Sequence, residues 1–159
     1  MLMGLGRFDE ADASIRKAVE LAPGASRPHA YLAMIGIMQG NAAAALAAAG
    51  REPAGPWHDV AMALALQIGP DRAAANAALK NLTDKDAAGD SYQIAEVYAL
   101  RRDPDNMFRW LERARINRDA GIELILFDPF ILRYRNDPRF ASFCKKVGLP
   151  TTTDAKALP

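Results

Sequence analysis

The chain has 159 residues, of which half are apolar and a quarter are charged, and its formal net charge is +1. This balance is typical of one soluble domain, and it argues against a protein that binds nucleic acid through bulk positive charge. The charge is uneven, with 8 basic and 11 acidic residues in 1–100 and 12 and 8 in 101–159, but this falls short of a nucleic-acid-binding pattern.

Helix-forming residues dominate the sequence, because alanine is used heavily and β-branched residues are few. The first clear unit is a turn at Gly6 that leads into an amphipathic stretch. In this stretch Ala11 and Ala18 lie seven residues apart on one face, and Pro23 closes the unit. The sequence therefore predicts a turn followed by a helix.

Similar units recur with a period of about 34 residues, which is the length of a helix–turn–helix repeat. They occupy about 26–55, 56–87 and 88–118, and each pairs two apolar stretches across a short turn. We expect a loop over Gly50–Pro56 and a polar linker over Leu82–Asp90, where the repeat pattern is interrupted.

The period is lost after Arg118. Two short apolar stretches, 122–127 and 130–134, predict short helical segments, and a last helix is expected over 139–147. The tail 151–159 has no apolar periodicity, so we expect it to be disordered.

Several motifs carry a resemblance to the tetratricopeptide repeat family. The segment Gly6-Arg7-Phe8-Asp9-Glu10-Ala11 resembles the second half of such a repeat. The segments Trp110-Leu111-Glu112-Arg113-Ala114, Asn136-Asp137-Pro138-Arg139-Phe140 and Gly148-Leu149-Pro150 resemble the closing part of repeat modules attached to bacterial class III adenylate or guanylate cyclases.

The resemblance implies an all-α fold, a right-handed superhelical stack of antiparallel helix hairpins. The domain would span 1–150, with a half repeat over 1–25 and capping helices over 119–150. Only a stub, 1–5, stands where a first helix of the opening repeat would lie, and an open end exposes its apolar face. We therefore expect the chain to be a C-terminal fragment of a larger protein, or this end to be covered by another molecule.

In this family the first helix of each repeat lines a concave groove, which in this chain would be mostly apolar and rich in methionine. Such a surface suits an amphipathic helix or an extended peptide. Alternatively, these side chains pack against neighbouring helices or against C-terminal helices folded into the groove. The predicted groove residues are Arg27, Ala30, Met34, Ile37, Met38, His58, Met62, Leu66, Tyr92, Glu96 and Leu100, with Ala65 and Ala99 beside them.

Residue patterns for catalysis or metal binding are weak. His29 and His58 are the only histidines, and no ligand spacing accompanies them. Cys144 precedes two lysines that would lower its pKa, yet a structural thiol is the favoured interpretation. The acidic stretch 84–90 lacks two oxygen ligands of a calcium loop, and no phosphate-binding motif occurs. We expect no cofactor, no metal and no enzyme activity in this segment.

Three functions remain open, in a fixed order of preference. The first is a protein-interaction module, the arm of a multidomain bacterial signalling protein such as a nucleotide cyclase, which binds a peptide or another domain of the parent chain. The second is a homo-oligomerisation module, and the third is a binder of small ligands.

Trp57 and Trp110 are expected in the core. No apolar run is long enough for a transmembrane helix and no signal-peptide pattern begins the chain, so we expect a cytoplasmic protein.

Overall fold

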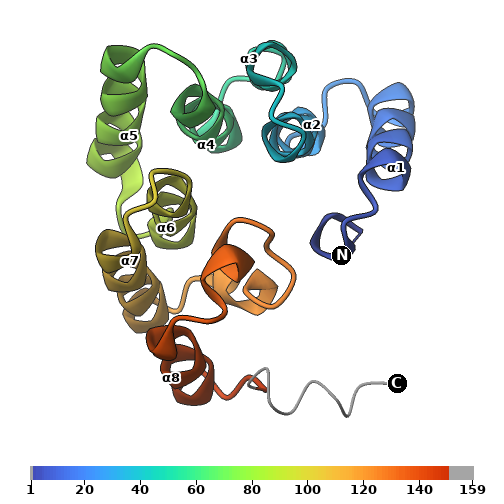
Figure 1. The fold of residues 1–159 in the computed structure, drawn as a ribbon. Coiled ribbons are helices and arrows are strands. Elements are labelled where there is room, and N and C mark those ends of the chain that lie inside the picture. Colours follow the sequence, from blue (N-terminus) through green and yellow to red (C-terminus); the bar gives the residue numbers. More distant parts are fainter. Residues whose placement is uncertain (1, 151–159) are drawn as a thin grey trace.

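Residues 2–150 are described by a computed structural model, and within this range every regular element is a helix (Figure 1). Four short 3₁₀ helices, η1 (Met3–Leu5), η2 (Leu66–Ile68), η3 (Ala120–Leu124) and η4 (Ile131–Tyr134), accompany the α-helices. The α-helices are α1 (Phe8–Leu21), α2 (Pro28–Met38), α3 (Ala42–Ala49), α4 (Pro56–Ala65), α5 (Arg72–Asp86), α6 (Ser91–Leu100), α7 (Pro104–Asn117) and α8 (Pro138–Lys146). The all-α prediction is therefore confirmed for this part of the chain.

Helix starts follow the local sequence closely. Proline occupies the first position of α2, α4, α7 and α8, where its missing N–H would have no partner within the helix. A side-chain oxygen accepts a backbone N–H two or three residues on at the starts of α3, α5, α7 and α8, from Asn41, Asp71, Asp103 and Asp137. These caps fix the helix boundaries without help from the tertiary fold.

The start of α2 is capped from a distance. Arg27 occupies the N-cap position with φ of 92° and supplies no side-chain cap. Instead, Glu52 from the loop after α3 accepts the backbone N–H groups of Arg27 at 2.6 Å and Ala30 at 2.9 Å. Glu52 is buried, so these charge-assisted bonds offset the cost of removing its carboxylate from water. The loop 50–56 thus ties α3 back to α2.

The helices follow one another along an arc whose inner side carries α2, α4 and α6, while α3, α5 and α7 lie outside (Figure 1). Consecutive inner helices contact each other, α2 with α4 and α4 with α6, and each also packs on an outer helix. The pairs α2–α3, α4–α5 and α6–α7 fall within the ranges expected for the three repeats.

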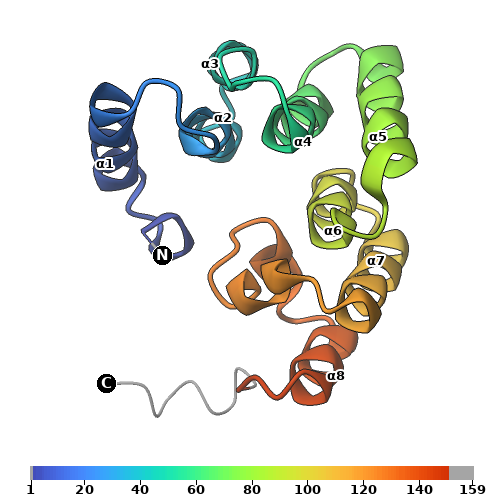
Figure 2. The same ribbon diagram turned by 180° about the vertical axis from the view of Figure 1, so that it is seen from behind.

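The segment between α7 and α8 turns inward and lies inside the arc, as both views of the ribbon show (Figures 1 and 2). Phe130 and Ile131 of this segment are buried. The hydroxyl of Tyr134 donates to the carbonyl of Ala99 on α6 at 2.8 Å, and Arg133 reaches the sulfur of Met38 on α2 at 3.5 Å. The inner face is therefore partly occupied by the chain itself, the alternative that the sequence left open.

The N-terminal end of the arc meets the segment that lies inside it. A Cβ on Gly4 in η1 would lie 2.2 Å from the carbonyl oxygen of Phe127, so only glycine allows this approach. Residues 2–5 and 124–130 thereby face each other across the opening of the arc.

Two boundaries differ from expectation. Residues 82–90 are not a linker, because α5 continues to Asp86 and Leu82 is buried. The salt bridge of Lys80 with Asp84 and the hydrogen bond from Thr83 to the carbonyl of Leu79 support this last turn. The stretch 122–127 is not continuous helix, since η3 ends at Leu124 and turns follow. The tail 151–159 lies outside the described residues.

Helices α2 and α3 approach each other closely at Gly36. A Cβ at this position would lie 2.8 Å from the backbone nitrogen of Ala45. Both residues are buried, so the helix backbones would have to move apart to admit a side chain.

Replacing Gly36 with alanine should lower the free energy of unfolding by about 1–3 kcal/mol, because the added methyl group overpacks the α2–α3 contact. Urea unfolding followed by circular dichroism measures this change. Gly24→Ala is the matched control, since a Cβ there meets no atom within 4 Å and the variant should unfold like the native chain. Equal stabilities for both variants would contradict the packing described for α2 and α3.

Candidate functional site

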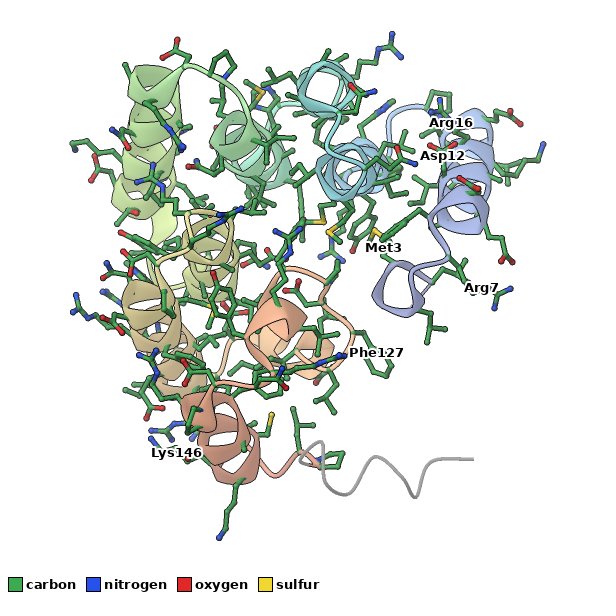
Figure 3. The ribbon with its side chains drawn as sticks, in the orientation of Figure 1. Met3, Arg7, Asp12, Arg16, Phe127 and Lys146 are labelled. Carbon is green, nitrogen blue, oxygen red and sulfur yellow. The ribbon has the colours of Figure 1, made fainter. Side chains whose placement is uncertain are left out.

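A cavity of about 400 Å³ opens on the inner side of the arc. Residues of η1, α1, α2, α4 and α6 form its walls, together with the segment 124–130. Figure 3 shows Met3 extending from η1 toward the interior. It also shows Phe127 on the segment 118–137 between α7 and α8, which is called the C-terminal segment below. The lining residues are Leu2, Met3, Ala11, Ser14, Ile15, Tyr31, Met34, Trp57, Tyr92, Gln93, Glu96, Leu124, Phe127, Asp128, Pro129 and Phe130.

Two buried carboxyl groups meet at the wall formed by α6. Glu96 and Asp128 are 6% and 5% exposed, and each acts on the pKa of the other. Tyr92 lies one turn before Glu96 on the same helix face, and its hydroxyl donates to Asp128 at 2.8 Å. The backbone N–H groups of Phe130 and Ile131 also donate to Asp128, at 2.7 and 3.3 Å.

The proton of this carboxyl pair resides on Glu96. Burial raises the pKa of both groups, but the donors around Asp128 act in the opposite direction on that residue and stabilise its ionised form. The pKa of Glu96 is raised well above its usual value, first by burial and then by the negative charges of Asp128 and Asp119. The surroundings of the pair therefore favour protonation of Glu96 over protonation of Asp128.

Asp119 organises the start of α6 beneath this pair. One carboxylate oxygen of Asp119 accepts the backbone N–H of Tyr92 at 2.9 Å, and the other accepts the N–H of Gly121 at 2.8 Å. Gly121 lies against the Tyr92 ring, where a Cβ would be 2.6 Å from a ring carbon. These contacts fix the position of the Tyr92 side chain and so the direction of its hydroxyl.

Two aromatic rings also line the cavity. Tyr31 of α2 and Trp57 of α4 are both half-buried, and their ring centroids lie 6.0 Å apart at an interplanar angle of 52°. Such tilted pairs are a favourable arrangement for aromatic rings. The guanidinium carbon of Arg27 lies 5.0 Å from the centroid of the Trp57 ring, although Arg27 is not among the residues that line the cavity.

The structure brings together three of the predicted groove residues, Met34, Tyr92 and Glu96, in the wall of the cavity. The others lie elsewhere. Ala30 and Ile37 are buried in the core, and the partly buried ones are Met38, His58, Met62, Leu66 and Leu100. Arg27 is exposed. The predicted continuous groove is interrupted because the C-terminal segment covers part of it, including Met38, which Arg133 contacts.

Several lining residues are absent from the sequence prediction. Ser14 and Ile15 belong to α1, outside the first helices of the repeats, and Leu124 and Phe127 belong to the segment where the repeat is lost. Trp57 was expected in the core, yet it is half-buried and lines the cavity. The only feature of the sequence that could have indicated these lining residues was the apolar stretch 122–127, which lies beyond the repeats.

Three further residues with reactive side chains, Cys144, His29 and His58, lie outside this cavity. Cys144 is buried in α8, and burial raises the pKa of its thiol, opposite to the lowering expected from the lysines that follow. The Nδ1 atom of His29 is buried without a hydrogen bond, and His58 lies 3.8 Å from Asp59. Among residues 2–150, no three His, Cys, Asp or Glu side chains are grouped as metal ligands would be. No helix in the same range is long and apolar enough to cross a membrane.

Comparison with known proteins gives no match, whether against family models, curated proteins or solved structures. The resemblance to tetratricopeptide repeats therefore stays a prediction from the motifs, and the function has to be argued from the cavity.

Replacing Glu96 with glutamine should flatten the dependence of stability on pH. Because the pKa of Glu96 is raised in the folded state, the folded chain binds more protons than the unfolded chain above pH about 4.3, and the free energy of unfolding falls as pH rises. The loss is about 1.4 kcal/mol for each unit by which the pKa is raised. Glutamine cannot titrate, so urea unfolding between about pH 5 and pH 8 should show a shallower decline.

The control for this experiment is Glu123→Gln at an exposed position, which should reproduce the native pH dependence. Parallel curves for the native chain and Glu96→Gln would mean that Glu96 does not hold the proton of the carboxyl pair.

Proposed function

We propose that the chain is a protein-interaction module of tetratricopeptide type whose inner cavity receives a side chain from a segment of a partner protein. The observation that carries this proposal is the cavity itself, open on the inner side of the arc and walled mainly by apolar and aromatic side chains of five helices and one loop. Concave, mostly apolar sites with a few convergent polar groups are the usual sites of recognition.

The C-terminal segment narrows the choice of partner. An amphipathic helix laid along α2, α4 and α6 would collide with residues 124–134, which already occupy this face through Asp128, Phe130 and Tyr134. A cavity of about 400 Å³ has room for one or two side chains. We therefore favour a short segment that inserts an anchor residue over a long helix.

Binding is a better assignment for this cavity than catalysis. Asp128 is engaged by three hydrogen-bond donors and by Glu96, so its carboxylate is held in place as part of the fold. A general base would instead need a free lone pair directed at a substrate proton.

The wider setting belongs to the same proposal and is supported by the motifs. We propose that the helix pairs form a right-handed superhelical stack, and that the module is the cytoplasmic arm of a longer signalling protein such as a nucleotide cyclase. The arc of paired helices is compatible with this arrangement (Figure 1).

Self-association is a second candidate, favoured by the state of α1. Ala11 is the one residue of this 14-residue helix that is buried, and Leu21 at its end is 76% exposed. An apolar helix surface of this kind is buried in solenoids by the next repeat. In its place a second copy of the chain could cover α1.

The proposed function predicts that peptides bind in the cavity and that filling it prevents binding. Selection of a random linear peptide library on the native chain should enrich a family of related sequences. Ser14→Trp places a bulky ring at an exposed position of α1 that lines the cavity, and it should weaken binding of the selected peptides about tenfold or more in calorimetric titrations.

Ala13→Trp is the matched control, because Ala13 is equally classed as exposed and is not among the lining residues. It should leave the affinity unchanged. Equal binding by both variants would place the interaction outside the cavity, and a selection that enriches nothing would overturn the proposed function.

Self-association predicts that the native chain dimerises as its concentration rises in sedimentation equilibrium, and that Leu21→Glu abolishes the dimer by placing a charge on α1. Ile116→Glu on α7, at a position that is 66% exposed, should leave dimerisation unaffected. A native chain that sediments as a monomer at every concentration would remove this candidate.

A further inference from the structure

The charged residues that line the cavity are all acidic, and the one guanidinium described beside it, that of Arg27, lies over the Trp57 ring and not in the lining. The lining includes two carboxyl groups, Glu96 and Asp128, and no lysine, arginine or histidine. The charged groups that act on Glu96 are Asp128 and Asp119, which are both acidic. The rest of the lining is dominated by apolar and aromatic side chains. The cavity therefore has an apolar body and one negative wall.

We propose that the cavity is selective for a basic anchor residue, lysine or arginine, whose alkyl stem lies on the apolar wall and whose cation lies beside Glu96 and Asp128. This inference rests on the proposed function, since it names the residue by which a partner segment would be recognised. An acidic anchor is disfavoured by the same wall, because it would bring a second negative charge beside the buried Asp128 carboxylate, which costs free energy.

The carboxyl pair explains why a cation is preferred to a neutral group. In the free chain a proton on Glu96 compensates the second negative charge of the pair. An ammonium or guanidinium group could replace this proton and form charge-assisted hydrogen bonds with carboxylate oxygens at the wall. A neutral polar group would leave the proton in place and gain only an ordinary hydrogen bond.

The aromatic rings of the lining favour the same ligand. A cation within about 6 Å of a tryptophan or tyrosine ring is attracted by the ring electrons. Arg27 shows that the Trp57 ring attracts a guanidinium group, which lies 5.0 Å from its centroid. The aliphatic stems of lysine and arginine also bury well against apolar surface such as Met34 and Ile15.

Binding of a cation should depend on pH in a defined direction. The groups that face Glu96 are Asp128 from the C-terminal segment, Asp119 before η3 and Tyr92 on its own helix. At low pH the proton on Glu96 competes with the cation, so affinity for a basic anchor should rise with pH through the raised pKa of Glu96. It should then stay level until the lysine loses its proton near pH 10.

The experiment uses the peptides selected on the native chain. Enriched sequences should carry lysine or arginine at one fixed position, and replacing this lysine with norleucine should weaken binding to the native chain about tenfold. Glu96→Gln should bind both forms of the peptide nearly equally. The ratio of the affinities for the lysine and norleucine peptides is measured for the native chain and for Glu96→Gln. The change in this ratio measures the coupling between Glu96 and the anchor directly. Glu123→Gln, at an exposed position, should keep the native preference.

Small probes test the charge preference without a peptide. Hexylammonium, hexanol and hexanoate have the same alkyl chain and differ in charge. Trp57 lines the cavity, whereas Trp110 on α7 does not. In an NMR titration the indole N–H signal of Trp57 therefore reports binding, and that of Trp110 serves as the internal reference. Hexylammonium should shift the Trp57 signal at lower concentration than hexanol, and hexanoate should have the weakest effect.

The outcomes separate this inference from the proposed function. Enriched peptides that lack a basic residue, and that Ser14→Trp no longer binds, would overturn the basic anchor and leave the interaction module standing. A response to hexylammonium without any enriched peptide would support the charge preference and reassign the cavity to a free organic amine. Equal responses to all three probes, with no enrichment, would overturn both.

Discussion

The buried carboxylate of Asp128 is the interaction on which the inner face of this protein depends. A buried charge without partners costs several kcal/mol. The carboxylate of Asp128 has three such partners, because it accepts hydrogen bonds from the hydroxyl of Tyr92 and from the backbone N–H groups of Phe130 and Ile131. Two of these donors belong to its own segment and one belongs to α6. The same hydrogen bonds therefore shape the turn at 128–131 and fix it to the helix across the arc.

The cavity follows from this attachment. With the C-terminal segment held against α6, the close approach of Phe127 to Gly4 joins this segment to the N-terminal end of the arc. The space that remains is lined by the aromatic rings of Tyr31 and Trp57 and by the carboxyl pair. A repeat stack without this segment would present an open groove along its inner helices. In this chain one cavity takes the place of the groove. One wall of this cavity is acidic, and the rest of its lining is mainly apolar.

Local features of the fold could be predicted from the sequence, and distant ones could not. The helix at 42–49 lies between Asn41 and Gly50, which are an N-cap residue and a helix-ending residue, and α7 and α8 start directly after Asp103 and Asp137 with a proline. In each case the responsible residue is adjacent to the boundary that it sets. The resemblance to tetratricopeptide repeats implied that the first helix of each pair lies on the inner side, which is why Met34, Tyr92 and Glu96 were expected there.

The remaining features depend on partners far apart in the chain. Glu52 caps α2 from more than 20 residues away, and Asp128 meets Tyr92 across 36 residues. Neither pairing follows from periodicity, because loops obey no helical repeat and a single sequence carries no record of which distant residues meet. The cavity also depends on the close approach of Gly4 to Phe127, which are far apart in the sequence. For this reason its walls from α1 and 124–130 could not be predicted.

Amide hydrogen exchange at Phe130 and Ile131, measured residue by residue by NMR, tests most directly whether Asp128 holds the C-terminal segment inside the arc. Both N–H groups donate to this buried carboxylate, so they should exchange as slowly as the core amides of α6. Their protection should fall together in Tyr92→Phe, which removes the hydrogen bond from α6. Fast exchange of both amides in the native chain, with α6 still protected, would show that the segment leaves the inner face and would contradict the account.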